Sequence, residues 1–241
     1  MRFSVELLLD SEKIPKDKNR MILSLLKHNY SSYDENYYYE LFEKNSNKMK
    51  SYTFSVYMGK CEFLRESILI PSKKIILNFS AYDMKDGIMF YNSFLNNKGI
   101  KYHIKGNSLT INRINLIKEK PIMKNEVIFR SLSPISVREH NGDNKTTWYH
   151  TLNDKKGQEV FMNNLRYRLF NYFGQERKYD IEEVDYQVIT NKEVKVKHYG
   201  IEVLGNICKL KIKAKPYILD FLYKGGIGSQ TGTGFGMVDL I

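Results

Sequence analysis

The residues whose types and spacing most clearly suggest chemistry lie between 224 and 241, where six of the fifteen glycines of the chain occur. Glycine is used where the backbone takes positive φ values or where another molecule must approach the main chain closely. Successive amides in such a loop can form a concavity that binds an anion. The loop therefore predicts a phosphate-binding site, with Lys224 as the nearest positive charge. Its candidate contacts are Gly226, Gly228, Ser229, Gln230, Gly234 and Gly236.

The spacing in this segment excludes two common nucleotide loops. A Walker loop requires Lys-Ser or Lys-Thr directly after its final glycine, whereas Gly234 is followed by Phe235 and Gly228 by Ser229. A dinucleotide fingerprint must open a helix and lead into another strand. Only five residues follow Gly236. The segment is therefore predicted to close a domain.

A run of alternating lysines precedes the loop. If this run is a strand, its ammonium groups leave one face while Cys208, Leu210, Ile212 and Ala214 enter the core. Such a positive stripe, with Lys195, Lys197 and His198 nearby, favours a groove that follows a nucleic-acid backbone. A merely solvated sheet face remains the alternative. The stripe consists of Lys209, Lys211, Lys213 and Lys215.

Composition narrows the classes of partner and excludes several kinds of site. The chain has 241 residues, 42% of them hydrophobic, and a formal net charge of +11, which indicates an acidic partner such as nucleic acid or an anionic membrane surface. A general bias towards lysine is the alternative explanation of the charge. Cys61 and Cys208 stand far apart, which argues against a zinc site or a disulfide framework. We expect a cytoplasmic protein without cofactor, metal or membrane span.

Hydrophobic periodicity predicts the order strand, helix, strand, strand, helix, strand twice over, which is the order of the ferredoxin-like unit. We therefore expect an α+β fold of two tandem ferredoxin-like (RRM-like) domains, covering residues 1–121 and 122–241. Residues 194–203 form an extra hairpin-like segment that fits no element of this scheme and are interpreted as an insertion. The predicted strands are 2–9, 52–57, 73–80, 107–117, 126–131, 184–189, 207–214 and 235–241, and the helices carry the apolar stripes of 21–26, 84–95, 161–172 and 216–223.

Two glycine-hydrophobic-glycine pairs, Gly226-Ile227-Gly228 and Gly234-Phe235-Gly236, are separated by five residues. Together with Arg2-Phe-Ser-Val-Glu-Leu-Leu-Leu9, Tyr52-Thr-Phe-Ser-Val-Tyr57 and Leu132-Ser-Pro-Ile-Ser-Val137, this pattern resembles the CRISPR-associated repeat-RNA endoribonucleases of the RAMP superfamily. One departure is that family loops usually carry Lys or Arg among the five central residues, which here read Ser-Gln-Thr-Gly-Thr. The resemblance covers nearly the whole chain.

The resemblance implies cleavage of precursor CRISPR transcripts within or beside a repeat hairpin. Attack by the 2′-hydroxyl without a metal would leave 2′,3′-cyclic phosphate and 5′-hydroxyl ends. The implied partners are repeat RNA and other subunits of an interference complex, and a homodimer is left open. The alternative is a subunit with the same fold that binds repeat RNA without cutting it. An incidental basic surface on a structural protein is a third reading.

Candidate catalytic residues also follow from the resemblance, because family members draw a histidine, with tyrosine and lysine helpers, from the first helical region. His28 is the histidine there, since the later window where relatives carry one reads Glu43-Lys44-Asn45-Ser46. An imidazole suits proton transfer near neutral pH, and Lys50 matches a family lysine position. Tyr38, from the tyrosine-rich stretch 30–39, completes the predicted set. His140 is the reserve base, and Arg130 and Arg138 are predicted to grip RNA phosphates.

Overall fold

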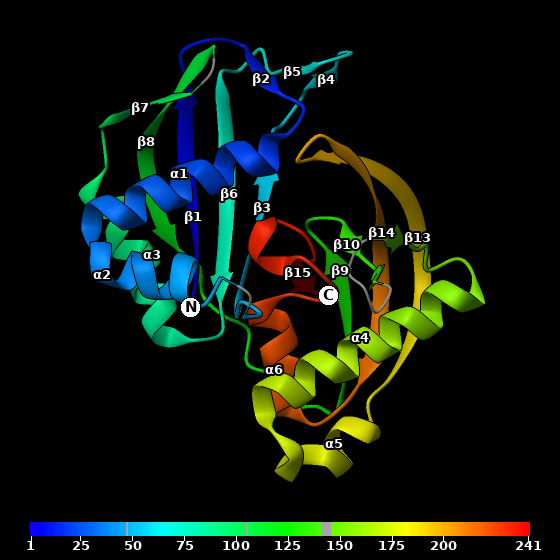
Figure 1. Cartoon of the computed structure of the whole chain (residues 1–241). Coiled ribbons are helices and arrows are strands. Elements are labelled where there is room, and N and C mark those ends of the chain that lie inside the picture. Colours follow the sequence, from blue (N-terminus) through cyan, green and yellow to red (C-terminus); the bar gives the residue numbers. More distant parts are fainter. Residues whose placement is uncertain (47, 105, 141–145) are drawn as a thin grey trace.

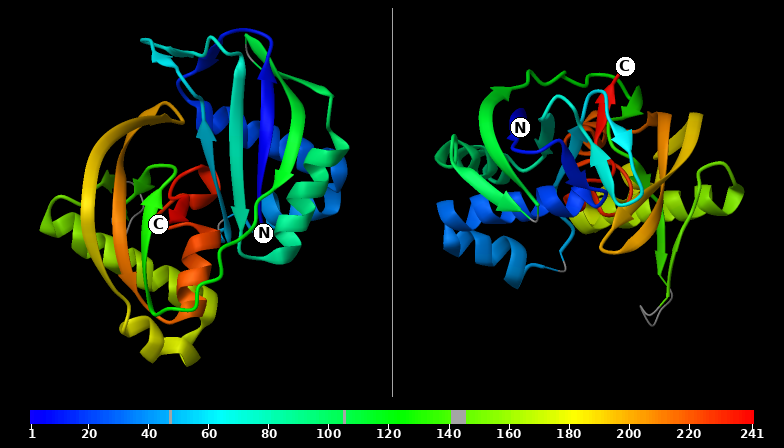
Figure 2. Two further views of the ribbon diagram at one scale, coloured as in Figure 1. Left: turned by 180° about the vertical axis from the view of Figure 1, so that it is seen from behind. Right: turned by 90° about the horizontal axis from the view of Figure 1, so that it is seen from above.

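The computed structural model describes residues 1–46, 48–104, 106–140 and 146–241. Two α+β units lie side by side (Figure 1), and in each of them helices cover one face of a sheet. Seen from behind, the strands of both units face the viewer (Figure 2). The helical layers of the two units therefore share one side of the molecule and the sheets share the other.

The first unit contains a five-stranded antiparallel sheet in the order β3-β6-β1-β8-β7. Strand β1 is central, and the order of its four main strands and two helices is that of a ferredoxin-like unit, with β7 added at the edge. The elements are β1 (Arg2–Leu9), α1 (Lys18–Tyr33), β3 (Tyr52–Tyr57), β6 (Lys74–Ala81), α3 (Met84–Asn96), β7 (Lys101–Ile104) and β8 (Asn107–Leu116).

Smaller elements decorate this unit. A short helix α2 (Glu35–Tyr38) and a π-helix η1 (Tyr39–Lys44) follow α1, and β2 (Lys13–Pro15), β5 (Ser67–Leu69) and β4 (Glu62–Phe63) form a separate three-stranded sheet. The π-helix brings the chain back towards β3. It thereby places Lys48, Met49 and Lys50 at the border between the two units.

Local sequence explains why these elements form. Phe3, Val5 and Leu7 of β1 are fully buried, as the alternating pattern predicts. Helix α1 begins after Asp17, whose carboxylate accepts a hydrogen bond from the Arg20 amide over 3.3 Å. Asp83 caps α3 in the same way. The apolar faces of α1 and α3 then pack on the sheet in one core.

The second unit repeats the same order of elements. Its strands pair in the order β13-β14-β9-β15, and β10 pairs with another part of β14. The main elements are β9 (Glu126–Ser131), β10 (Ile135–Ser136), α4 (Lys155–Phe173), β13 (Asp185–His198), β14 (Ile201–Lys213), α6 (Pro216–Gly225) and β15 (Val238–Leu240). The smaller ones are β11 (Arg138–His140), β12 (Thr147–Tyr149), η2 (Gln175–Arg177), α5 (Lys178–Glu182) and η3 (Thr231–Thr233).

The predicted α+β fold of two tandem ferredoxin-like units is confirmed. Residues 194–203 form a hairpin, because they are the far ends of β13 and β14 and pair in continuous register from Val194↔Gly205 to His198↔Ile201. Their interpretation as an insertion stays a prediction. The closing strand is shorter than predicted, since β15 covers only Val238–Leu240. The domain boundary at residues 121 and 122 stays a prediction; it lies in the connection between β8 and β9.

Buried polar contacts join the two units. Arg2, at the start of β1, donates hydrogen bonds to the carbonyl oxygens of Tyr223, over 3.2 Å, and Val238, over 3.0 Å. Thr53 Oγ1 donates to the Phe235 carbonyl over 2.9 Å, and Asn19 Nδ2 donates to the Gly234 carbonyl over 3.2 Å. These bonds hold the glycine-rich segment against β3 and α1.

The described residues contain no helix that is both long and apolar enough to cross a membrane. Over the same ranges, no group of three or more His, Cys, Asp or Glu side chains is arranged to hold a metal ion.

Candidate functional site

The glycine-rich segment forms a loop between α6 and β15, and its glycines serve backbone conformation and close packing. Gly226, Gly228, Gly234 and Gly236 have φ values of 86°, 84°, 90° and 69°, a region that favours glycine. A Cβ at Gly236 would lie 1.9 Å from the Ile227 carbonyl oxygen. The loop conformation therefore depends on these residues directly.

Several amides of this loop are already bonded within the protein. The amides of Ile227 and Ser229 donate to the carbonyl oxygens of Gly236 and Ser136, each over 2.8 Å, and the Gly236 amide donates to Pro134 over 2.9 Å. Gly226, Gly234 and Gly236 are buried, whereas residues 228–230, 232 and 233 are partly exposed. The part of the loop that can meet a ligand is therefore its tip.

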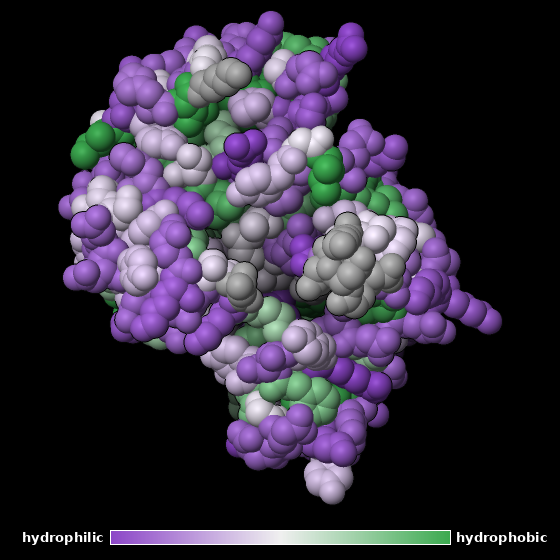
Figure 3. All heavy atoms as spheres, viewed as in Figure 1, coloured by the Kyte–Doolittle hydropathy of each residue, from purple (hydrophilic) through white to green (hydrophobic). Residues whose placement is uncertain are grey.

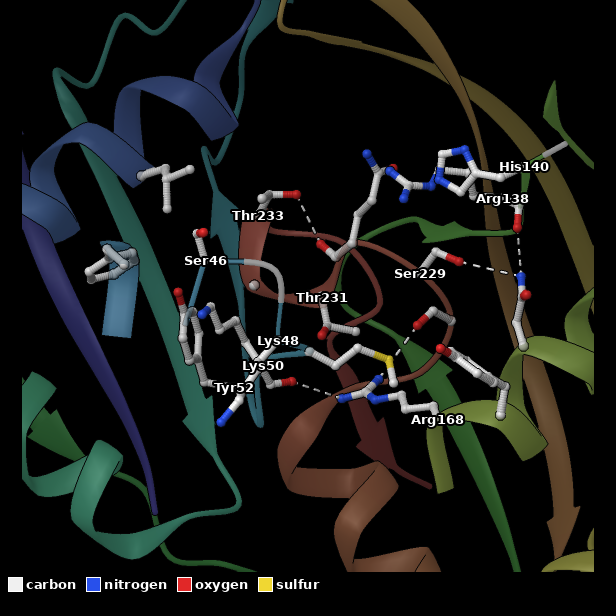
Figure 4. A pocket seen from close by; sticks show the side chains of 18 of the residues that line it. Ser46, Lys48, Lys50, Tyr52, Arg138, His140, Arg168, Ser229, Thr231 and Thr233 are labelled. Atoms are coloured by element: carbon white, nitrogen blue, oxygen red, sulfur yellow. Dashed lines mark hydrogen bonds between the residues drawn. The ribbon is translucent and has the colours of Figure 1, made fainter. Parts of the chain in front are cut away.

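The loop tip lines a pocket of about 530 Å³ between the two units. One wall comes from the first unit, through α1, Phe42, Ser46, residues 48–50 and Tyr52, and the other from β11 and α4 of the second unit (Figure 4). None of the described residues that line it is acidic. Its cationic and imidazole side chains are Lys27, Lys48, Lys50, Arg138, His140 and Arg168.

Arg168 of α4 holds the loop in place and was not predicted from the sequence. Its guanidinium is buried and donates to the carbonyl oxygens of Gly225, over 2.6 Å, and Gly226, over 2.8 Å, at the end of α6. A longer contact of 3.5 Å reaches the Lys50 carbonyl in the first unit. Burial lowers the pKa of Arg168 to about 10, so the side chain is cationic at neutral pH. A detectable signal was its position three residues after Leu165, within the apolar stripe of the helix.

Lys50 lies on the wall of the first unit. Its ammonium group donates to the carbonyl oxygens of Leu41, over 2.6 Å, and Asn45, over 2.7 Å. An ammonium group has three N–H donors, and described residues accept hydrogen bonds from two of them, so the third can bond to a ligand. Partial burial lowers the pKa of Lys50, which makes it a better proton donor than an exposed lysine. Its side chain also packs beside Gly232 of the loop.

His140 lies at the end of β11 on the opposite wall. Its Nδ1 atom is 3.0 Å from Thr147 Oγ1. His140 is exposed, and slight burial, with secondarily the positive charge of Arg138, lowers its pKa below the ordinary value of 6.5. The imidazole is therefore neutral at pH 7. Asn164 fixes this wall to the loop by donating to the Arg138 carbonyl over 2.8 Å and to Ser229 Oγ over 3.4 Å.

Two of the predicted catalytic residues do not line this pocket. His28 is exposed on α1 and stacks on the ring of Tyr102 from β7, with centroids 4.7 Å apart. Tyr38 packs against Phe42 and its hydroxyl is 3.5 Å from Glu43 Oε1. The structure brings together Lys50, the reserve base His140, Arg138, Gly228, Ser229 and Gln230. The catalytic assignments of His28 and Tyr38 stay predictions.

Three members of the lysine stripe lie on β14, on the other face of the sheet from the pocket, whereas Lys215 follows the strand and is the residue before α6. Leu210 and Ile212 pack in the core with α4 and α6, so Lys209, Lys211 and Lys213 project from the opposite face. Arg130 pairs there with Asp239 over 3.2 Å. Lys224 lies away from the stripe, with its ammonium group 2.9 Å from Asp220 and 3.0 Å from Glu119. Burial lowers the pKa of Lys224, but these two carboxylates outweigh it and raise the pKa overall. RNA binding by these residues stays a prediction.

Comparison with known proteins identifies relatives of the whole chain. The family model of the C-terminal part of CRISPR-associated protein Cas6 matches residues 117–240. The CRISPR-associated endoribonuclease-like protein Cas6nc of Pyrococcus horikoshii is 26% identical, over 86% of this chain and 92% of the relative.

Two solved structures share the fold at 24% identity and cover the whole of this chain. They are a Cas6-related protein from Pyrococcus furiosus, with a TM-score of 0.84 over 98% of that chain, and a RAMP protein that binds different RNA substrates, with a TM-score of 0.83 over 99%. The resemblance stated from the sequence is thereby confirmed. Because the family model spans more than half of its residues, the chain belongs to the Cas6 family of CRISPR-associated proteins.

Proposed function

We propose that the chain binds the repeat RNA of a CRISPR precursor transcript and cleaves it in the pocket between its two units. The observation that carries this proposal is the lining of the pocket, where Lys50, Arg138 and His140 surround the tip of the glycine-rich loop and no described residue is acidic. A polyanion is the ligand that such a lining attracts. Family membership supports repeat RNA as that polyanion.

The proposed reaction needs no group beyond the RNA and side chains of the protein. The 2′-hydroxyl oxygen attacks the adjacent phosphorus, the bond from phosphorus to the 5′-oxygen breaks, and the products end in a 2′,3′-cyclic phosphate and a 5′-hydroxyl. One group must remove the 2′-hydroxyl proton, another must donate a proton to the departing 5′-oxygen, and cations must stabilise the extra charge on the phosphate.

The pocket supplies a candidate for each role. The neutral imidazole is the main form of His140 at pH 7, because slight burial and Arg138 lower its pKa, and it can accept the 2′-hydroxyl proton. Lys50 retains one N–H donor and has a lowered pKa, so it can donate to the 5′-oxygen. Arg138 offers a bidentate contact to a phosphate. Lys50 and His140 enter from opposite walls (Figure 4), as in-line displacement requires of an acid and a base.

A second candidate function is repeat-RNA binding without cleavage. It is favoured by a specific observation: Ser46 lines the pocket in the window where relatives carry a histidine, while His28 and Tyr38 lie outside the pocket. Under this alternative the basic pocket and the loop hold RNA for other subunits. Association with such subunits, or as a homodimer, is compatible with either function.

The decisive experiment is incubation of the purified protein with the repeat RNA of its own locus in EDTA. We expect cleavage at one position, a 2′,3′-cyclic phosphate on the upstream product, and no cleavage when the nucleotide upstream of the cut carries 2′-deoxyribose. Tight, salt-sensitive binding without a cut would assign the protein to the non-catalytic class. Cleavage of the 2′-deoxy substrate would exclude the proposed chemistry.

A further inference from the structure

A second pocket of about 470 Å³ adjoins the first. The two pockets share residues 48–50 and the pair Tyr167 and Arg168, so a ligand held in one can continue directly into the other. Its remaining walls are Asn171, Tyr172 and Phe221. Figure 3 shows this side of the molecule, where hydrophilic side chains dominate and apolar ones appear in scattered patches.

The second pocket combines an aromatic wall with positive charge. Tyr172 of α4 is 43% exposed, and its ring is held from behind by Phe221, with centroids 4.5 Å apart, and by the edge contact of Tyr82 at 5.4 Å. Its ring position is therefore fixed before any ligand arrives. Tyr167 is 66% exposed. It lies four residues before Asn171, so these two side chains share one side of α4.

Asn171 adds a hydrogen-bonding group to this wall. One of its side-chain N–H groups donates to the Tyr167 carbonyl over 2.7 Å, which fixes the orientation of the amide. Its Oδ1 atom accepts no hydrogen bond from any described residue, and a carbonyl oxygen can accept two. The amide is thus positioned to bond the edge of a flat polar group that lies on the aromatic wall.

The positive charges of the pocket favour a flat group that is attached to an anion. Lys48, Lys50 and Arg168 line the pocket, and none of its described lining residues is acidic. These cations disfavour a basic peptide side chain. An unpaired nucleobase matches every kind of group that lines the pocket. It is flat, stacks on aromatic rings, forms hydrogen bonds through its edge and is joined to a phosphate.

We propose that the second pocket binds one unpaired base of the RNA, belonging to the nucleotide next to the phosphate held in the first pocket. The base stacks on Tyr172 and bonds to Asn171 through its edge, while Lys48 and Lys50 contact the connecting phosphate. This proposal rests on the proposed function of the first pocket. It adds that the nucleotide beside the bound phosphate is unpaired, so a repeat hairpin ends at or before this point.

The test is a scan of repeat RNA in which each nucleotide in turn is replaced by an abasic ribonucleotide. Dissociation constants are measured for the unmodified protein, for Tyr172→Leu and for Tyr179→Leu, a control at a tyrosine that is 81% exposed outside both pockets. At one position beside the cut or protected phosphate, we expect the abasic change to weaken binding at least fivefold, the usual scale for loss of a stacked base. The same change should have less than a twofold effect in Tyr172→Leu and its full effect in Tyr179→Leu.

Because Tyr172 contributes to an aromatic cluster, Tyr172→Phe and Asn171→Ala are included. Tyr172→Phe retains the ring and should keep the fivefold effect of the abasic change. If Tyr172→Leu does not fold, Asn171→Ala is the test variant, and it should reduce that effect. Equal abasic effects in every folded variant, with repeat RNA still bound, would overturn the second pocket as a base site and leave the proposed function intact. Failure of the unmodified protein to bind unmodified repeat RNA would overturn both.

Discussion

The backbone amide of Tyr199 donates a hydrogen bond to the Asp17 carboxylate over 2.8 Å. Tyr199 lies at the tip of the hairpin formed by β13 and β14, and Asp17 is the residue before α1 of the other unit. The same carboxylate caps α1 through the Arg20 amide, and the Arg20 guanidinium lies 5.1 Å from the Tyr199 ring centroid. One acidic residue thus both starts the first helix and fixes the hairpin to it.

We predict that Asp17→Ala lowers the free energy of unfolding by about 1–2 kcal/mol, since the cap and the hairpin contact are lost together. Asp17→Asn should lose less, because the amide oxygen can still accept hydrogen bonds. Urea denaturation measures both changes. Equal losses in the two variants would show that charge, and not hydrogen bonding, dominates at this position.

A second prediction concerns His198, which is buried beside Phe235 with its Nδ1 atom 3.7 Å from Asp17 Oδ1. Burial lowers the pKa of His198, Lys18 and Arg20 lower it further, and Asp17 opposes them. The folded-state pKa is thus below the unfolded value of about 6.5, so the unfolded chain binds more protons in this range. Stability should fall as the pH drops through 6.5.

His198→Gln should remove this component of the pH dependence, and His103→Gln, at an exposed position on β7, should not. The measurement is the unfolding free energy between pH 5 and pH 8. A pH dependence of His198→Gln identical to that of the unmodified protein would mean that other groups control acid stability.

For cleavage, we predict that His140→Ala slows the single-turnover reaction by about a hundredfold or more, the scale of a lost general base. His28→Ala should change it less than threefold, because His28 stacks on Tyr102 outside the pocket. A large loss in His28→Ala with a normal rate in His140→Ala would support the assignment of His28 made from the sequence.

The rate should also depend on pH in a defined direction. A base that must be neutral gives a rate that rises with pH and reaches its plateau above the folded-state pKa, which for His140 lies below 6.5. Because the Arg138 charge lowers this pKa, Arg138→Gln should move the midpoint upwards. A midpoint that stays in place or moves downwards would remove His140 as the titrating base.

Arg168→Met should lower the free energy of unfolding by about 2 kcal/mol or more, since the carbonyl oxygens of Gly225 and Gly226 would lose their donor. Arg113→Met, at an exposed position on β8, should stay within about 0.5 kcal/mol of the unmodified protein. Arg168→Lys should recover only part of the loss, because one ammonium group cannot reproduce the fork of the guanidinium.

The loop glycines divide into two groups with different expected effects. Gly236→Ala should destabilise the fold, because its Cβ would lie 1.9 Å from the Ile227 carbonyl oxygen. Gly232→Ala should lower the melting temperature less than Gly236→Ala does, because the nearest atoms, Lys50 Cγ at 2.9 Å and Cβ at 3.1 Å, belong to a side chain and not to the backbone. Its repeat-RNA affinity should fall several-fold as Lys50 shifts. Normal affinity would separate Lys50 from the bound RNA.

The sequence predicted the fold because its elements carry strong local patterns. The alternation along β1 and the apolar stripe of α1 each determine both the type of element and its buried face. The hairpin at residues 194–203 was expected from the sequence, but its contact with Asp17 of the other unit was not, because no local pattern reveals it.

The site was predicted less completely because it lies between the units. Helical period placed His28 at the border of a stripe but could not show which border faces the second unit. The lysines of β14 alternate as expected, yet their position relative to the pocket depends on which face α4 and α6 cover. Arg168 is a charged residue within an apolar stripe, and its role appears only once the carbonyl oxygens of α6 are placed beside it.

The glycine-rich loop follows every other part of the pocket in the chain, which has a consequence during translation. Strands β1 to β8 can pair before the second unit emerges from the ribosome, but residues 228–233 leave the exit tunnel after both walls of the pocket have been made. A nascent chain therefore has no complete pocket with which to engage RNA. Binding activity should therefore arise only after residues 228–233 have left the exit tunnel and packed between the two walls.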